Sequence, residues 1–255
     1  MKKQYTIEDL LDILVTLRGE NGCPWDRVQT HESIKKDMIE EAYEAIDALQ
    51  KGDDKAFANE LGDVLLQVVF HSQIAKERGA FEFNDVLNEI CEKLISRHTH
   101  VFGDAKAENT KEALNEWEKN KKKEKALDTY TDNLKDVPKY LPALMRAQKV
   151  QKRAAEPGFD FPDAKEALLK LEEEIKELKQ AMEENSNIEE EFGDLLFSAV
   201  NTGRLLGITA ETALSDATEK FIDRFDRMEK KILSEKLDFK ALNLDEMDEF
   251  WKKIK

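Results

Sequence analysis

Apolar residues recur at spacings of three and four along most of the chain, which is the periodicity of amphipathic helices rather than of strands. The pattern predicts two sets of helices, one in each half. In the first half the predicted helices cover residues 7–17, 34–49, 57–74 and 86–95. In the second half they cover residues 141–150, 164–182, 188–206 and 210–233. The expected fold class is therefore all-α.

The segment between the two sets is rich in charge and contains Pro138 and Pro142, which break helices. It divides the chain into an N-terminal domain over residues 1–125, a linker over 126–140 and a C-terminal domain over 141–255. Each of these two domains is long enough to bury a core of its own.

Four sequence blocks occur in the same order in both halves, which indicates duplicated domains. Two of the blocks are acidic, an EExxE followed by an ExxD, and the third is EKxIxR. The fourth block contains a tryptophan. The matched positions are Glu40 with Glu173, Glu60 with Glu191, Glu92 with Glu219, and Trp117 with Trp251.

The two acidic blocks place pairs of carboxylates three residues apart, so each pair projects from one face of its helix. A turn over residues 183–187 joins the two helices of the second copy, and Gly52-Asp53-Asp54 forms the corresponding turn in the first. Antiparallel helices joined in this way bring both pairs together. The candidate metal ligands are Glu174, Glu177, Glu191 and Asp194 in the second copy and Glu41, Glu44, Glu60 and Asp63 in the first.

Acidic helix faces are common in charged proteins without any bound ion. Here, however, each ExxD pair directly precedes an apolar run, and a glycine that costs roughly 1 kcal/mol in a helix stands between the two acids. Acids in a core-facing segment need a compensating partner, which a cation would supply. None of the four histidines completes an ExxH iron motif, so the all-oxygen ligand set favours Mg²⁺, with Mn²⁺ as an alternative.

Composition limits the partners and the compartment. The chain has 55 acidic residues against 40 Lys and Arg, and the net charge of −15 disfavours nucleic acid and anionic membranes as partners. Cys23 and Cys91 show no metal-binding or CxxC spacing, which suits reduced thiols. No apolar run approaches the length of a membrane span, and the N-terminus has the pattern of an amphipathic helix. We expect a cytoplasmic protein.

With these blocks, the sequence resembles the MazG family of nucleoside triphosphate pyrophosphohydrolases, whose signature is EExxE followed by ExxD in an all-α domain. The resemblance covers nearly the whole chain, including both copies and the GCPWDRVQTH segment at residues 22–31. It implies Mg²⁺-dependent cleavage of nucleoside triphosphates to nucleoside monophosphate and pyrophosphate. It also implies a homodimer, because short helical hairpins bury little surface alone and a second copy would complete each four-helix domain.

The resemblance also assigns substrate contacts. Lys220 and Arg224 are four residues apart on a predicted helix, a spacing that suits phosphate oxygens but by itself favours a solvated helix face. By resemblance they bind phosphate, as does Lys170, one turn before Glu174. Trp251 is assigned to the base or ribose end of the substrate. The position of Lys170 is occupied by Asp37 in the first copy, so the second copy is expected to be the principal active domain.

No serine or cysteine stands in a nucleophile motif and no Walker loop is present, so water is the expected nucleophile. Glu173 or Glu190 would accept its proton, and the sequence does not decide between them. Two rival interpretations remain. One is a non-catalytic acidic helical dimer that binds other proteins, and the other is a narrow-specificity pyrophosphatase similar to the all-α dUTPases.

Overall fold

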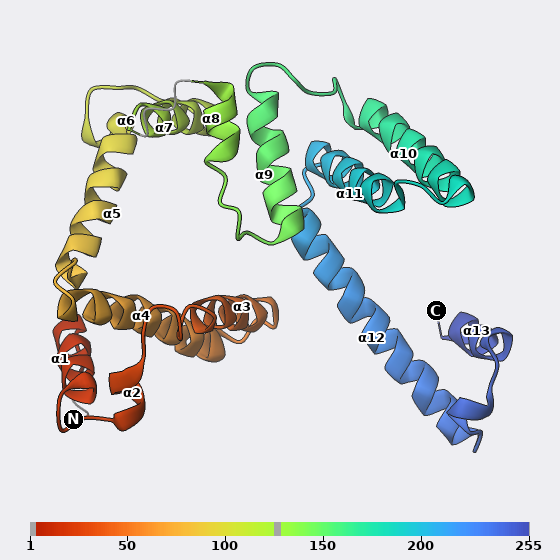
Figure 1. Ribbon diagram of the computed structural model, residues 1–255, viewed down its shortest axis with the longest axis horizontal. Helices are drawn as coiled ribbons and strands as arrows, with labels where there is room; N and C mark the ends of the chain where they lie inside the picture. Colours follow the sequence, from red (N-terminus) through yellow and green to blue (C-terminus); the bar gives the residue numbers. More distant parts are fainter. Residues whose placement is uncertain (1–3, 125–128, 255) are drawn as a thin grey trace. The chain divides into compact units, whose positions relative to one another are not determined.

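Every regular element is a helix in the computed structural model, which describes residues 4–124 and 129–254 (Figure 1). This confirms the predicted all-α fold class. The chain divides into two compact units, residues 1–125 and 126–255. Within the described ranges, no helix combines the length and the apolar character that a bilayer crossing requires.

The first unit is built around the antiparallel hairpin of α3 and α4, against which α1 packs. The side chain of Asp53 caps α4 by accepting hydrogen bonds from the backbone N–H groups of Lys55 and Ala56. The turn between α3 and α4 therefore lies at Gly52-Asp53-Asp54, as the sequence predicts. The helices of this unit are α1 (Ile7–Arg18), α2 (Pro24–Val28), α3 (Asp37–Gln50), α4 (Asp54–Glu77), α5 (Phe83–Arg97), α6 (Thr99–Phe102) and α7 (Thr110–Glu124).

The second unit repeats the hairpin with α10 and α11, and α9 packs against α8, α11 and α12. The long α12 leads away from the hairpin, and α13 folds back onto it around a small core of Met228, Ile232 and Phe250. The elements are α8 (Tyr130–Lys135), α9 (Ala143–Ala155), α10 (Ala164–Glu184), α11 (Ile188–Leu205), α12 (Ala210–Ser234), the 3-10 turn η1 (Phe239–Ala241) and α13 (Leu244–Lys253).

The segment expected as a linker over residues 126–140 differs from that prediction. Its described part belongs to the second unit, because α8 packs against α9 and Val137 is only 1% exposed. Arg153 of α9 donates hydrogen bonds to the backbone oxygen of Asn133 and to Asp136, the latter at 3.2 Å. A buried arginine therefore binds a segment whose charge and prolines are typical of a linker. Residues 126–128 lie outside the described chain.

Each hairpin leaves part of its apolar face exposed within a single chain. Tyr43 and Ile46 of α3 are about half exposed, as are Phe192 and Leu196 of α11. Rows of large apolar side chains of this kind usually mark a surface that another molecule covers. The hairpins therefore have more apolar surface than their own units bury.

Candidate metal and nucleotide site

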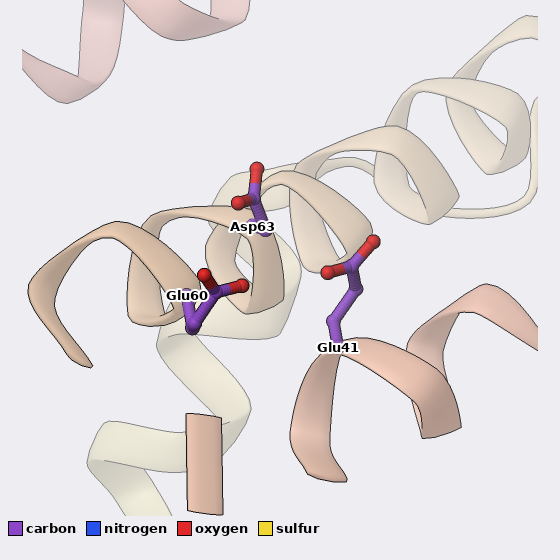
Figure 2. A group of neighbouring side chains, drawn as sticks. All are labelled: Glu41, Glu60 and Asp63. Atoms are coloured by element: carbon purple, nitrogen blue, oxygen red, sulfur yellow. The ribbon is translucent and has the colours of Figure 1, made fainter. Parts of the chain in front are cut away.

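Three carboxylates of the first unit meet where α3 faces the first half of α4. Glu41, Glu60 and Asp63 each offer an oxygen, and these oxygens lie within 4.8 Å of one another (Figure 2). Burial raises the pKa of Glu41, and the negative charges of Asp63, Glu44, Glu60 and Asp37 raise it further. Glu44 is therefore close enough to act on the group electrostatically, although it is not one of the three converging acids.

The second unit places Glu174, Glu191 and Asp194 in the equivalent arrangement, again with oxygens within 4.8 Å. Glu174 is buried, and its Oε1 lies 3.0 Å from Nζ of Lys170. Lys170 also lies 3.1 Å from Glu173 and 3.9 Å from Glu177. Hydrogen bonds to Glu174 and Glu173 raise the pKa of the Lys170 ammonium group. A built-in cation therefore partly neutralises this carboxylate group.

At the position that matches Lys170, the first unit has an acid instead of a cation. Asp37 occupies the matching position and forms its ion pair with the neighbouring Lys36, at 3.6 Å. Among the described residues, none of the three converging acids of the first unit forms an ion pair, although Asn59 donates a hydrogen bond to Asp63 at 3.3 Å. The two groups thus share their ligand geometry and differ by a local charge of two.

The donor sets fit a hard divalent cation. Both consist entirely of carboxylate oxygens, which suit Mg²⁺ and Mn²⁺ and are poor ligands for softer metals. In the first unit, burial and then the negative charges of the neighbouring acids raise the pKa of Glu41, so ionising this group has a cost in free energy. A cation relieves that cost, so these residues can hold such an ion.

The expected substrate residues on α12 and α13 lie apart from these carboxylates within one chain. The guanidinium carbon of Arg224 lies 4.1 Å from the ring centroid of Trp251, and its NH2 group donates to the Trp251 backbone oxygen at 3.3 Å. Lys220 is exposed, one turn earlier on α12. Helix α10 contacts neither α12 nor α13 in the described part of the chain (Figure 1). A single chain therefore does not bring these residues to Glu174.

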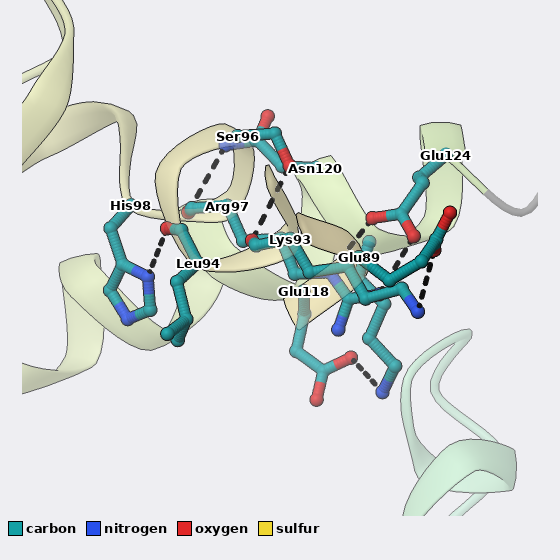
Figure 3. Close-up of polar contacts among 10 residues, drawn as sticks. Glu89, Lys93, Leu94, Ser96, Arg97, His98, Glu118, Asn120 and Glu124 are labelled. Atoms are coloured by element: carbon teal, nitrogen blue, oxygen red, sulfur yellow. Dashed lines mark hydrogen bonds and ion pairs between the residues drawn. The ribbon is translucent and has the colours of Figure 1, made fainter. Parts of the chain in front are cut away.

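The matching residues of the first unit are paired with acids (Figure 3). Arg97 donates hydrogen bonds of 2.9 and 3.0 Å to the two carboxylate oxygens of Glu124, and these bonds raise the pKa of Arg97. Lys93 lies 3.2 Å from Glu89. Arg97 also lies over the ring of Trp117, at 5.4 Å. The contact between arginine and tryptophan thus occurs in both units, at positions that belong to the matched sequence blocks.

The two candidate proton acceptors differ in their surroundings. Glu173 is bonded to Lys170, whereas Glu190 stands exposed in the first turn of α11. Both lie next to a converging acid in the sequence.

A cavity of about 600 Å³ in the second unit adjoins the carboxylates, and the sequence analysis missed it. Its wall combines α8 to α11 with the loop at residues 158–161, so it depends on α8 packing where a linker was expected. Lys170, Glu174 and Asp194 contribute one part of the wall. The rest is largely apolar and includes Leu134, Val150, Phe159, Phe161 and Phe197.

Known proteins are similar to this chain over nearly its whole length, and the same domain is found in both of its halves. A family model described as the MazG nucleotide pyrophosphohydrolase domain matches residues 29–102 and again 163–228. The nucleoside triphosphate pyrophosphohydrolase/pyrophosphatase MazG of Thermotoga maritima is 46% identical over 248 residues, covering 97% of this chain and 95% of its own. The nucleoside triphosphate pyrophosphohydrolase of Escherichia coli K12 is 45% identical over 254 residues, covering 98% and 97%. The chain therefore belongs to the MazG nucleotide pyrophosphohydrolase family.

Proposed function

We propose that this protein hydrolyses nucleoside triphosphates to nucleoside monophosphate and pyrophosphate. The observation that carries the proposal is the convergence of Glu174, Glu191 and Asp194 beside a cavity large enough for a nucleotide. The names of the relatives from Thermotoga maritima and Escherichia coli support the same reaction.

Mg²⁺ is the metal that the proposal requires, with Mn²⁺ as an alternative. Bound there, it would supply charge neutralisation for the phosphates and a water of lowered pKa. In the second unit the ion would be held by Glu174, Glu191 and Asp194, with Glu177 nearby. In the first unit it would be held by Glu41, Glu60 and Asp63, with Glu44 nearby.

The remaining chemistry falls to side chains of this chain. Lys170, Lys220 and Arg224 donate charge-assisted hydrogen bonds to phosphate oxygens and so balance the charge of the departing pyrophosphate. Glu173 or Glu190 accepts the proton of the attacking water. Trp251 borders the base or ribose end. The second unit, which has Lys170 where the first has Asp37, carries most of the activity.

A homodimer would bring these side chains together. Lys220 and Arg224 lie on α12, away from the carboxylates of their own chain, while the apolar face of each hairpin stays exposed. A Cβ atom at Gly62 or Gly193 would meet nothing within 4 Å, so packing within one chain does not require these helical glycines. A second copy on the hairpin face would bury that surface and supply α12 to the site.

Product identification tests the function. The full-length protein is incubated with Mg²⁺ and a panel of NTPs and dNTPs, and the products are separated chromatographically. Monophosphate and pyrophosphate from several nucleotides support the proposal. Cleavage of dUTP alone would indicate the narrow pyrophosphatase, and no cleavage would leave the non-catalytic dimer.

Site variants then locate the reaction. In a Glu41→Gln background, which removes a ligand of the first unit, Glu174→Gln and Asp194→Asn should each abolish hydrolysis. Both changes remove a charged ligand and nearly preserve volume. The matched control is Glu183→Gln, an exposed acid on the same helix as Glu174. Near-normal rates in both site variants would refute the assignment.

A further inference from the structure

The amide of a single side chain binds the turn between α11 and α12. Nε2 of Gln148 on α9 donates a hydrogen bond of 2.9 Å to the backbone oxygen of Ile208, and its Oε1 accepts one of 3.1 Å from the backbone N–H of Ala210. The backbone oxygen can only accept and the N–H can only donate, so the two partners determine the orientation of the amide. Gln148 thus holds the chain on both sides of Thr209, the N-cap residue of α12.

Helix α12 depends on this amide for its N-terminal cap. The first N–H groups of a helix have no partner within it, and the side chain of the N-cap residue usually supplies one. The side chain of Thr209 makes no such bond. Oε1 of Gln148, 62 residues earlier in the sequence, accepts instead from Ala210, the first residue of the helix. The start of α12 is therefore capped from α9.

The end of α11 is closed by its own backbone. Gly207 has a φ of +75°, which glycine adopts readily, and the N–H of Ile208 donates to the backbone oxygen of Gly203 at 2.8 Å. Beyond this turn α12 leads away from the hairpin (Figure 1). Within the described chain it contacts α9 and α11, and otherwise only η1 and α13, which pack toward its far end around Met228 and Ile232. The contacts between α12 and the hairpin are thus concentrated where Gln148 binds.

Lys220 and Arg224 lie far enough along α12 for its starting direction to affect their positions. With a rise of 1.5 Å per residue, they are about 15 and 21 Å beyond Ala210. A rotation of about 10° at the start of the helix would move them by roughly 2.6 and 3.7 Å. Charge-assisted hydrogen bonds to phosphate oxygens are only about 2.7–2.9 Å long, so displacements of this size break them.

From this geometry we propose that Gln148 is a positioning residue: it fixes the direction of α12 so that Lys220 and Arg224 reach the phosphates of the substrate. The inference rests on the proposed function for the roles of these two side chains. Gln148 is neither one of the converging acids nor part of the cavity wall, so it acts through α12 alone. Its loss should leave metal binding unchanged and weaken only the contacts that α12 supplies.

A double-mutant cycle tests this coupling on the full-length protein. In the Glu41→Gln background, Gln148→Met should lower kcat/KM for ATP about tenfold, roughly the loss of one charge-assisted contact. When Lys220→Ala and Arg224→Ala are also present, the same change should lower it less than about threefold, because the contacts through which Gln148 acts are already absent. A general loss of stability would lower kcat/KM by the same factor in both proteins, and that result would overturn the inference.

Gln151→Met is the matched control. Gln151 lies one turn later on α9, and its Nε2 donates a hydrogen bond of 2.8 Å to the backbone oxygen of Phe197 on α11. This variant loses a bond of the same kind from the same helix and leaves the start of α12 capped. Any loss of kcat/KM that it causes should therefore be the same factor with and without Lys220 and Arg224. Equal coupling in Gln148→Met and Gln151→Met would contradict a specific role of Gln148.

Two measurements examine the same proteins without turnover. Hydrogen exchange over residues 206–214 should be faster in Gln148→Met than in Gln151→Met, because the N–H of Ala210 loses its acceptor; equal exchange would overturn the inference. Calorimetric titration with Mn²⁺ should give the same Kd for Gln148→Met as for the Glu41→Gln parent, because the carboxylates stay on the hairpin. A Kd for Mn²⁺ that rises as much as kcat/KM falls would place the effect of Gln148 on the hairpin and not on α12.

Failure of the proposed function gives a different result. If the parent cleaves no nucleotide, that function fails, and the same cycle on the Kd of α,β-methylene-ATP still decides whether Gln148 acts through Lys220 and Arg224. If Lys220→Ala and Arg224→Ala change neither kcat/KM nor this Kd, α12 does not bind phosphate, and the inference is wrong even where exchange is faster.

Discussion

Replacing Lys170 by methionine should tighten metal binding and weaken catalysis at the same time. Lys170 lies 3.0 Å from Glu174 and 3.1 Å from Glu173, so its positive charge occupies the edge of the site that would hold a divalent cation. Methionine keeps most of the side-chain length and removes the charge. The variant therefore removes a cation that would compete with the proposed metal for Glu174, and it also removes the proposed phosphate contact.

The size of the effect follows from the local geometry. Two unit charges 4 Å apart interact by about 4 kcal/mol at the effective dielectric constant near a protein surface. The Lys170 side chain is 35% exposed, so water screens part of this repulsion between lysine and metal. Loss of the ion pair also leaves the Glu174 carboxylate, 7% exposed, available to the metal. We expect affinity to rise about tenfold, or about 1.4 kcal/mol.

The assay is calorimetric titration of the full-length protein with Mn²⁺ in the Glu41→Gln background. Lys176→Met on the same helix is the control, because Lys176 is exposed and the structure gives it no ion pair with the converging acids. Lys170→Met should bind Mn²⁺ about tenfold more tightly than this control and hydrolyse nucleotide more slowly. Unchanged or weaker Mn²⁺ binding would refute the placement of the metal beside Lys170.

Three further predictions follow from the two units. Mg²⁺ at a hundredfold excess over its Kd should stabilise the metal-binding unit by about 2.7 kcal/mol in thermal unfolding, and a Tm indifferent to Mg²⁺ and chelator would contradict a metal site. Lys220→Ala should lower kcat/KM about ten- to a hundredfold. Lys93→Ala should lower it far less, because Lys93 belongs to the copy that has Asp37; equal losses would mean that both copies catalyse the reaction. His71→Asn should reduce the loss of stability of the first unit in acid.

The sign of the last prediction follows from the histidine pair. Nδ1 of His71 lies 2.8 Å from Nδ1 of His31, and burial, followed by the charge of His31, lowers the pKa of His71. The unfolded chain therefore takes up this proton first, and stability is lost as pH falls below about 6.5, by at most about 1.4 kcal/mol per pH unit. Asparagine retains a hydrogen-bonding group without titrating. Denaturant unfolding at several pH values measures the difference, with His98→Gln as the control; the same acid sensitivity in both variants would contradict it.

The local sequence was sufficient to predict the principal helices and the groups of converging acids. Periodic apolar residues predicted the principal helices, because a 3.6-residue repeat decides which face of a helix is buried. The spacing of three between Glu191 and Asp194, together with a short turn, was enough to predict that three of the four candidate ligands in each copy converge. Glu44 and Glu177 are not among the converging acids. Both features depend on residues close together in the chain, whose geometry the backbone sets.

Contacts between residues far apart in the sequence determined how the helices pack and where the cavity forms. Charge and prolines suggested a linker at residues 126–140, but the hydrogen bonds from buried Arg153 hold α8 against α9 and close one wall of the cavity. The side chain of Gln151 on α9 donates a hydrogen bond to the backbone oxygen of Phe197, 46 residues away on α11, and its own Oε1 is left buried with no hydrogen-bond partner in the described chain. The position of Lys220 relative to Glu174 likewise depends on how α12 leaves the hairpin. Pattern and propensity describe one element at a time, so they do not determine which elements meet or which buried groups the packing leaves unsatisfied.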